Sequence, residues 1–285
     1  MKHSLRPLLA SGRTLVVPGV GDALGAILVK ETGFPCLYMS GYYVSACLGY
    51  LDVGLISSTE MITQAARICA AADMPVIADA DTGYGNALNV IRSVREFEAA
   101  GVAAIHLEDQ DLPKKSGHME GLKLVSAAEM CAKIEAAVDA RSSDEFLLIA
   151  RTDAIASGGI DEAIRRANDY RRAGSDALMI MAPRSIDDLK RFRDGVEGPL
   201  AVTVGSWTFN TNAQELEKIG YQLALFTIST LRRMVVVTRE VLSQLRSDGG
   251  LDHSAPAMMP MNDLHRLLGQ DQVKAWEKRY GGDKS

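Results

Sequence analysis

The fold is decided by the stretch PVIADADTGYGNALNVIRSVREFEAAGVAAIHLEDQ, residues 75–110. It begins with a short apolar run that ends in Asp79 and Asp81, continues with an amphipathic segment at 87–101, and closes with a second apolar run that ends in Glu108. Both runs are continuous rather than alternating, which is typical of strands buried on both faces of a parallel sheet. The stretch therefore predicts a strand–helix–strand unit with acids at the ends of both strands.

The same alternation runs through most of the chain, and it recurs about eight times. Several of the intervening helical segments end in Gly just before the next run, as helix C-caps do. This predicts an α/β fold, a (β/α)8 TIM-type barrel with an extra C-terminal helical segment. The runner-up is a doubly wound open sheet, but no GxGxxG follows the first run. The runs are TLVVPG, CLYMSG, PVIADAD, AAIHLED, LLIARTD, ALMIMAP, PLAVTVG and QLALFTI.

The pattern changes after about residue 228. The segment 229–250 is typical of one long helix, and 263–282 of a final amphipathic helix that follows a loop with two prolines. We expect residues 1–245 to form the catalytic barrel domain and residues 246–285 to form a helical extension. The apolar face of that extension must be covered, either by its own barrel or by a neighbouring subunit.

The composition is that of an ordinary globular protein, with 285 residues, 47% of them hydrophobic and 24% charged. A net charge of −5 gives no electrostatic case for nucleic acid or an anionic membrane as a partner. The N-terminus lacks the apolar run of a signal peptide, so we expect a cytoplasmic location. Four cysteines without metal spacing are expected to be buried free thiols, namely Cys36, Cys47, Cys69 and Cys131.

Acidic side chains gather where three of the predicted strands end. In a barrel, catalytic residues lie at the carboxyl ends of the strands, so these acids should share one rim. Carboxylates that repel one another in a concave site need a cation, and hard oxygen ligands select Mg²⁺ or Mn²⁺ over zinc. We expect Asp81 to ligate the metal directly, and Glu108 and Asp79 to do so directly or through water. The bland alternative is that each acid caps a helix or pairs with a nearby cation.

Five motifs together resemble those of the isocitrate lyase/phosphoenolpyruvate mutase superfamily. They are VVPGVGDALGA, YMSGYYVSA, DADTGYGNALNV, HLEDQ…KKSGH and IARTDA. The similarity extends from about residue 5 to 245. It is greatest to the branch of methylisocitrate lyase, dimethylmalate lyase, petal-death protein and carboxyphosphonoenolpyruvate mutase. It implies a barrel whose last helix is exchanged between subunits, in a homotetramer built of two helix-swapped dimers.

The resemblance also implies a site for a small 2-hydroxy or 2-oxo acid beside the metal, with Asp52 near the ligands. Arg151 would contact the oxygen that gains negative charge, and the loop from Lys114 to His118 would close over the site. The physical logic agrees, because a cation and an arginine stabilise an enolate, and a closing loop excludes water. The remaining candidate residues are Lys115, Ser116 and His118 as catalytic groups, and Ser40, Gly41, Tyr42, Gly117 and Thr203 as substrate-binding groups.

Three positions depart from the lyase branch. Its loop carries a cysteine as the general acid/base where this chain has Ser116, whose hydroxyl is a far weaker acid. An ungapped comparison also places Met181 where that branch has glutamate, and Thr203 where it has asparagine. A single Cys→Ser change is a familiar engineered trap, whereas three coordinated changes favour an altered substrate or an altered chemistry.

We therefore expect a Mg²⁺-dependent lyase that cleaves a C–C bond of a small 2-hydroxy- or 2-oxo-dicarboxylate through a metal-stabilised enolate. An oxaloacetate decarboxylase is the first alternative, because loss of CO₂ needs no base to start it. Phosphonopyruvate or mutase-type P–C chemistry is another. The last is a binding protein that retains the site without turnover.

Overall fold

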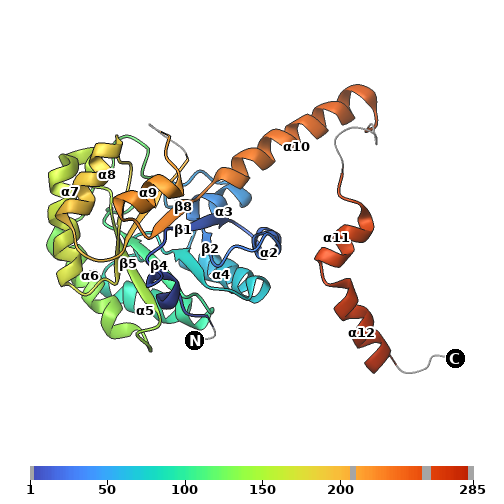
Figure 1. Ribbon diagram of the computed structural model, residues 1–285, viewed down its shortest axis with the longest axis horizontal. Helices are drawn as coiled ribbons and strands as arrows, with labels where there is room; N and C mark the ends of the chain where they lie inside the picture. The colour runs from blue at the N-terminus through green and yellow to red at the C-terminus, as the bar shows by residue number, and fades with distance from the viewer. Residues whose placement is uncertain (1–2, 206–209, 252–257, 282–285) are drawn as a thin grey trace. The chain divides into compact units, whose positions relative to one another are not determined.

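The computed structural model describes residues 3–205, 210–251 and 258–281 (Figure 1). In this part of the chain, eight parallel strands close into a barrel, with each strand paired to its chain neighbours and β1 paired to β8. Closure confirms the predicted TIM-type barrel, since an open sheet would leave two strands unpaired at its edges. The strands are β1 Leu15–Val20, β2 Leu37–Met39, β3 Val76–Asp79, β4 Ala104–Glu108, β5 Leu147–Thr152, β6 Ala177–Ile180, β7 Leu200–Thr203 and β8 Leu223–Phe226.

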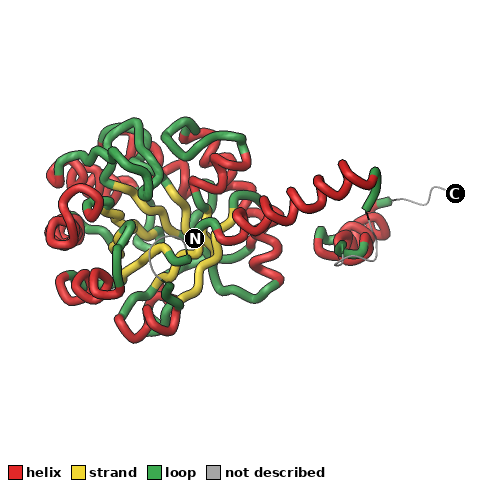
Figure 2. The backbone as a smooth tube through the Cα atoms, turned by 90° about the horizontal axis from the view of Figure 1, so that it is seen from above, coloured by secondary structure: helices red, strands yellow, loops and turns green. Residues whose placement is uncertain are grey.

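Helices surround the barrel, and the view in Figure 2 shows the yellow strands gathered inside a ring of red helices. Most of them connect one strand to the next, which is the βα alternation expected from the sequence. The helices of the barrel unit are α1 Arg6–Leu9, α2 Ala23–Glu31, α3 Gly41–Cys47, α4 Ser58–Ala72, α5 Ala87–Ala99, α6 Ala127–Ala140, α7 Ile155–Arg172, α8 Ile186–Gly195, α9 Ala213–Ile219 and the start of α10 Ser229–Asp248.

The stretch 75–110 folds as predicted, with α5 between β3 and β4. Asn86 begins α5 by accepting hydrogen bonds from two backbone N–H groups of the first turn, and Asn89 returns a bond to the backbone of Asn86. Gly83 and Gly85 precede this cap with φ values of +82° and +150°, which glycine adopts at little cost. The cap thus fixes where the loop after β3 ends and leaves Asp79 and Asp81 at the rim.

Strand register brings the polar strand ends together. Asp79 lies opposite His106 in the β3–β4 ladder, and Glu108 lies opposite Arg151 in the β4–β5 ladder. All of these residues are buried. Because the strands are parallel, their carboxyl ends lie at the same edge of the barrel. The acids predicted at the ends of neighbouring strands therefore do share one rim.

The core has two layers. The larger layer fills the space between strands and helices, with residues such as Phe97, Phe146 and Phe192. The smaller layer fills the barrel interior, and Leu5, which precedes α1, belongs to it with no exposed surface. The N-terminal segment therefore closes the barrel interior at the end away from the acids.

The chain folds as two compact units, Met1–Arg232 and Arg233–Ser285. The long helix predicted at 229–250 is confirmed as α10. The single final helix predicted at 263–282 is wrong, because the chain forms α11 Met261–Leu267 and α12 Gln270–Tyr280 instead. Gly269 separates them in the left-handed region, at φ +87°. The apolar side chains of Val273 and Trp276 on α12 are exposed. Part of the proline-containing loop, residues 252–257, lies outside the described residues.

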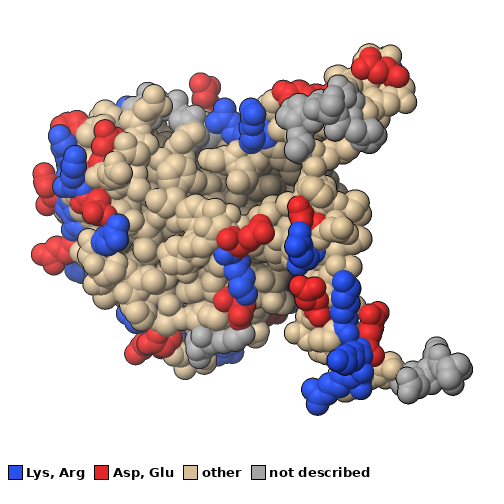
Figure 3. Space-filling view, turned by 45° about the vertical axis from the view of Figure 1, so that its right-hand side comes forward, with Lys and Arg blue, Asp and Glu red and all other residues tan. Residues whose placement is uncertain are grey.

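The cysteines correct one expectation. All four are free thiols, as predicted, but only Cys36 is fully buried. Cys69 and Cys131 are half-buried, and Cys47 is exposed because it ends α3 on the outer surface. On the face drawn in Figure 3, acidic and basic side chains are intermixed. Within the described ranges, no helix is both long and apolar enough to cross a bilayer.

Candidate active site

Asp79, the last residue of β3, is held by backbone donors. Its Oδ2 accepts a hydrogen bond of 3.1 Å from the N–H of Gly41, and its Oδ1 accepts one of 3.0 Å from the N–H of Asp81. Burial alone would raise its pKa, but His106 at 3.3 Å and nearby cations lower the pKa to about 2. Asp79 is therefore a fixed negative charge whose orientation is set by α3 and by the turn after β3.

Asp81 lies in a strained turn. Its φ is +46°, in the left-handed region that non-glycine residues rarely adopt. Its carbonyl accepts a hydrogen bond of 2.9 Å from the N–H of Glu108, and the next carbonyl, that of Thr82, accepts one of 3.2 Å from the buried amine of Lys133. These bonds hold a backbone conformation that costs about 1–2 kcal/mol. The turn thereby directs the Asp81 carboxylate into the rim.

Lys114 places its ammonium group among the acids. Its Nζ lies 2.5 Å from Oδ1 of Asp52 and 2.7 Å from Oδ1 of Asp81, and the residue is buried. Burial opposes the charge, but Asp81 and Glu108 hold the pKa of Lys114 well above its usual value. The pKa of Asp81 is raised to about 6, chiefly by burial. Lys114 is thus a permanent cation that ties the loop to the carboxylates.

Glu108 and Arg151 form the second charged contact of the rim. Nη1 of Arg151 lies 3.0 Å from Oε2 of Glu108, and its Nε and Nη2 each donate a 2.9 Å hydrogen bond to Asp153. Burial raises the pKa of Glu108 well above its usual value, although Arg151 opposes the shift. The guanidinium group is clamped between two carboxylates, so its orientation is fixed before any ligand arrives.

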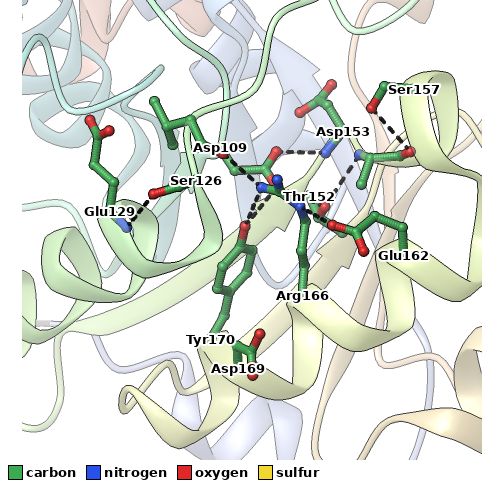
Figure 4. Close-up of polar contacts among 12 residues, drawn as sticks. Asp109, Ser126, Glu129, Thr152, Asp153, Ser157, Glu162, Arg166, Asp169 and Tyr170 are labelled. Carbon is green, nitrogen blue, oxygen red and sulfur yellow. Dashed lines mark hydrogen bonds and ion pairs between the residues drawn. The ribbon is translucent and has the colours of Figure 1, made fainter.

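Asp109 fixes this arrangement from behind (Figure 4). Its Oδ1 accepts a hydrogen bond of 2.9 Å from the N–H of Asp153. Its Oδ2 accepts from the hydroxyls of Thr152 at 2.9 Å and Tyr170 at 2.7 Å, and Arg166 lies 3.2 Å away. Because Tyr170 and Arg166 belong to α7, that helix holds the end of β4. Asp109 is thus a positioning residue for Asp153 and, through it, for the arginine.

Tyr38 and His106 support Asp79 from within the barrel. The Tyr38 hydroxyl lies 2.6 Å from Nε2 of His106 and donates a 3.2 Å hydrogen bond to Oδ2 of Asp79. Their rings stack with centroids 5.6 Å apart. Burial lowers the pKa of His106 to about 4, so its ring is neutral at neutral pH. The pair therefore supplies hydrogen bonds to the rim without adding charge.

The segment 110–124 is a loop after β4 whose two ends lie side by side at the rim. The N–H of Asp111 donates a 2.8 Å hydrogen bond to the carbonyl of Lys123, and the N–H of Val125 donates a 3.0 Å bond to the carbonyl of Asp109. We call this segment the gating loop. Its two ends are joined backbone to backbone, so the loop is closed at its base by the protein itself.

The two lysines of the gating loop diverge. The side chain of Gln110 binds both backbone groups of Lys115, at 2.9 Å each, and fixes the chain there. The amine of Lys115 then donates to the carbonyl of Glu120 at 3.1 Å and stays outside the rim. Lys114 takes the inner position. Lys115, which we expected to be catalytic, therefore lies away from the acids, and its neighbour lies among them.

Ser116 and Gly117 cover the site. The N–H of Ser116 donates a 3.0 Å hydrogen bond to the carbonyl of Asp52. A Cβ on Gly117 would lie 2.4 Å from Cγ of Met181 and 2.7 Å from Nη2 of Arg151, so only glycine fits this close approach.

Burial lowers the pKa of His118 to about 4, and the positive charge of Arg151 acts in the same direction. His118 is therefore neutral at neutral pH.

These groups line a small, partly open cavity of about 40 Å³. Its lining comes from the loop, the rim and the ends of the last three strands. The lining residues are Tyr38, Ser40, Tyr42, Asp52, Asp79, Ser116, Gly117, His118, Arg151, Met181, Thr203, Thr227 and Ile228.

Most of the residues predicted from the sequence meet here. Gly41 contributes through the hydrogen bond from its N–H to Asp79. Asp81 and Glu108 are not among the described lining residues; they lie next to the cavity, beside Lys114 and Arg151. Sequence reasoning missed the inner roles of Tyr38, His106 and Lys114, and the lining residues Thr227 and Ile228. Polar residues within otherwise apolar strands were the available signal for Tyr38 and His106.

Residues 5–246 match the family described as phosphoenolpyruvate phosphomutase. The chain is also 41% identical over 279 residues to 2,3-dimethylmalate lyase of Eubacterium barkeri, an alignment that covers 97% of this chain and 96% of that protein. The chain belongs to the phosphoenolpyruvate mutase/isocitrate lyase superfamily. Its most similar curated relatives include lyases, while the family description names a mutase.

Solved structures of this superfamily agree with the fold. The structure of oxaloacetate acetylhydrolase in complex with the inhibitor 3,3-difluorooxalacetate has a TM-score of 0.92 and 33% identity, and covers 99% of this chain and 97% of its own. Phosphonopyruvate hydrolase with oxalate and Mg²⁺ has a TM-score of 0.89 and 32% identity, and covers 97% of each chain. Superfamily membership makes this chain an enzyme, and it leaves lyase, hydrolase and mutase reactions as the candidates.

The rim has the donor set that a hard divalent cation requires. In the described residues, both carboxylate oxygens of Glu108 and the Tyr84 hydroxyl are buried and have no hydrogen-bond partner. Oδ1 of Asp81 lies 2.7 Å from the Lys114 ammonium, and Oε2 of Glu108 lies 3.0 Å from Nη1 of Arg151. Among these residues no three acidic, histidine or cysteine side chains already converge as direct ligands. The set fits Mg²⁺, which binds through one or two carboxylates and keeps several waters.

Proposed function

We propose that this chain is a Mg²⁺-dependent lyase that cleaves a C–C bond of a small 2-hydroxy- or 2-oxo-dicarboxylate. The observation that carries the proposal is the position of Arg151. Its guanidinium group is clamped by Glu108 and Asp153 and lines the cavity beside the carboxylates. A fixed cation at that place can stabilise the oxyanion of an enolate, the species that C–C cleavage next to a carboxyl or carbonyl group produces.

For a 2-hydroxy acid, the reaction needs two proton transfers. A base takes the proton from the C2 hydroxyl, the C2–O bond becomes a carbonyl, and the C2–C3 bond breaks. Its electron pair moves to C3 and delocalises into the attached carboxyl group, and an acid then protonates C3. Mg²⁺, which Asp81 and Glu108 would hold, would supply Lewis acidity to the substrate oxygens.

The proton-transfer groups proposed in this chain are His118 and Ser116, which both line the cavity. The imidazole of His118 is neutral because burial lowers its pKa to about 4, so it has a ring nitrogen that can accept a proton, as a weaker base than an ordinary histidine. The backbone of Ser116 is held at the cavity wall by the hydrogen bond from its N–H to the carbonyl of Asp52. The gating loop carries both groups, and it excludes water from the reacting atoms.

A second candidate is decarboxylation of oxaloacetate or a related acid. It is favoured by Ser116, because a hydroxyl is a poor acid at neutral pH, and loss of CO₂ requires no base to start it. In that reaction the C3–C4 bond breaks, its electrons form the enolate of the 2-oxo acid, and Arg151 and the loop act as above. The acid then needed is only the one that protonates C3.

A product assay with Mg²⁺ tests both candidates. The panel is oxaloacetate, 2-methylisocitrate, 2,3-dimethylmalate and phosphonopyruvate, each scored for pyruvate, glyoxylate, oxalate, CO₂ and phosphate. Pyruvate together with a carboxylic acid from a hydroxy acid supports the lyase. Pyruvate and CO₂ from oxaloacetate alone would replace it with the decarboxylase. Phosphate from phosphonopyruvate alone would reject both.

Variants connect the activity to the rim. Asp81→Asn should abolish turnover and also the rise in melting temperature that Mg²⁺ with oxalate produces. Asp161→Asn, an exposed acid on α7, is the matched control and should change neither. Ser116→Ala should slow the reaction on the order of 10²-fold or more if the hydroxyl relays a proton, and only a few-fold if it forms a wall. Retained activity in Asp81→Asn would sink the metal assignment.

We further propose that residues 246–285 form an extension that packs on a neighbouring subunit in a homotetramer. Exposed apolar side chains recur in this unit, among them Met261, Leu268, Val273 and Trp276, and an apolar surface of that extent favours a partner. The mass in solution by light scattering tests it. Removal of residues 246–285 should lower the number of subunits per particle, and an unchanged number of subunits would reject the proposal.

A further inference from the structure

The cavity has two chemically different walls. One is charged and comes from the rim of β3 and β5, with Asp79 and Arg151, and from Asp52 in the loop after α3. The other follows β6, β7 and β8, which are adjacent in the closed barrel, and it includes Met181, Thr203 and Ile228. A bound acid therefore meets charge on one side and neutral side chains on the other.

The neutral wall is a built surface. Met181 directly follows β6, is 5% exposed, and donates its N–H to the carbonyl of Thr152 at 3.1 Å. The next residue, Ala182, has φ +52°, an unusual value that turns the chain sharply after Met181. The Thr203 hydroxyl lies 3.8 Å from the Met181 sulfur. Two neighbouring strands thus present a thioether and a threonine that contact each other.

The cations near the cavity are already engaged. Among the described lining residues, Arg151 is the only lysine or arginine, and it is paired with Glu108 and Asp153. Lys114 is paired with Asp52 and Asp81. Arg184 lines a separate outer hollow that shares only Gly117 and His118 with the cavity, and it donates to the carbonyl of Ile155 at 3.1 Å.

We propose that Met181 and Thr203 select the substituent on C3 of the substrate, and that they select a short uncharged alkyl group. This inference rests on the proposed lyase function. The carboxylate and oxygen on C2 and the carboxylate attached to C3 lie at the charged wall, and the remaining substituent on C3 contacts the neutral wall. A carboxylate on that substituent would leave water without a counterion, which is strongly unfavourable.

A pair of matched substrates tests the selection. Both are 2-methylmalates; one carries a methyl group on C3 and the other a carboxymethyl group. With Mg²⁺ present, the C3-methyl compound should have the higher kcat/KM, by on the order of 10²-fold or more, because the second compound buries an uncompensated charge. Equal values, or a preference for the carboxymethyl compound, would overturn the inference.

Variants of the wall provide the second test. Met181→Lys supplies the missing counterion, so it should move the ratio of the two kcat/KM values at least tenfold toward the carboxymethyl compound. Met181→Leu is the matched control; it keeps the wall neutral, so the preference for methyl should stay at its wild-type level whatever happens to kcat. Thr203→Lys is the substitute if Met181→Lys fails to fold, as judged by circular dichroism. An unchanged ratio in a folded lysine variant contradicts the proposal.

Binding separates this inference from the proposed function. If neither compound is cleaved, the lyase proposal fails, but both compounds remain ligands for calorimetric titration in Mg²⁺. The C3-methyl compound should then still bind more tightly, and Met181→Lys should narrow the difference. Equal affinities in the wild type would reject the neutral-wall selection independently of any turnover.

Discussion

The ammonium group of Lys114 lies 2.7 Å from Oδ1 of Asp81. One residue comes from the gating loop and the other from the turn after β3. The contact therefore links the position of the loop to the charge of the rim. Since the next residues of the loop, Ser116 to His118, line the cavity, the charge balance at Asp81 also bears on how the cavity is covered.

Lys114→Met should lower the free energy of unfolding by about 3–5 kcal/mol, because it leaves buried carboxylates without their cation. Saturating Mg²⁺ should recover part of this loss, since it supplies positive charge to the same acids. Urea unfolding with and without Mg²⁺ measures both effects. Lys115→Met is the control, and it should change stability by less than about 0.5 kcal/mol. Equal losses in the two variants would contradict the inner position of Lys114.

Gly117→Ala should reduce kcat/KM on the order of 10²-fold or more, because a misplacement near 1 Å at a site of this kind has that effect. The added Cβ would lie 2.4 Å from Cγ of Met181 and 2.6 Å from Oδ1 of Asp153. Steady-state kinetics measures the loss. Gly250→Ala, where no atom lies within 4 Å of the added carbon, is the matched control. Wild-type kinetics in Gly117→Ala would show that the loop need not approach so closely.

Tyr170→Phe should lower the free energy of unfolding by about 1.5–3 kcal/mol, because it removes a buried hydrogen bond of 2.7 Å to the carboxylate of Asp109. The ring remains, so packing is preserved and the measured loss belongs to the hydroxyl. Denaturant unfolding gives the number. Tyr280→Phe, at a 68% exposed position, should have almost no effect. A comparable loss of unfolding free energy in both variants would contradict a strong hydrogen bond from Tyr170 to Asp109.

His118 should make stability fall as pH decreases below about 6.5. Burial lowers its pKa to about 4 in the folded protein, whereas the unfolded chain has a value near 6.5. Between these values the unfolded state binds more protons, so acid favours unfolding, by about 1–3 kcal/mol for a group that is partly exposed.

The measurement is urea unfolding of wild type and His118→Gln at pH 7.5 and 4.5. The stability of the wild type should fall more than that of the variant, and groups common to both, such as His106, cancel in the difference. His265→Gln, an exposed position, should follow the wild type. Parallel losses in wild type and His118→Gln would argue against a neutral, half-buried His118.

Much of the fold was predictable because it rests on local pattern. Continuous apolar runs ending in acids located β3 and β4 to within a residue or two, and the DTGYGNA segment carried its own cap in Asn86. The division between α11 and α12 was missed, because the helical periodicity continues across Gly269. The helix is interrupted there only by the left-handed backbone conformation of that glycine.

The sequence predicted which residue types form the site better than it predicted which way their side chains point. Lys114 and Lys115 are adjacent and chemically identical, and their divergence depends on how Gln110 holds the backbone of Lys115. The bond between Asp109 and Tyr170 joins residues 61 positions apart, and no local signal announces such a pairing. Pattern indicates which side chains approach the rim, whereas tertiary contacts decide which of them enter it.

The base of the gating loop has a consequence for how this chain can change. Asp111 and Lys123 are joined backbone to backbone, and Asp109, just before them, is held by α7 from outside the loop. The residues between 111 and 123 are thus a segment whose two ends are fixed by the barrel, and within it Lys114 supplies the cation that the buried acids require. A loop with fixed ends adds little closure entropy as it lengthens. New chemistry can be installed over the same acids by replacing the rest of this segment while a cation is kept at position 114.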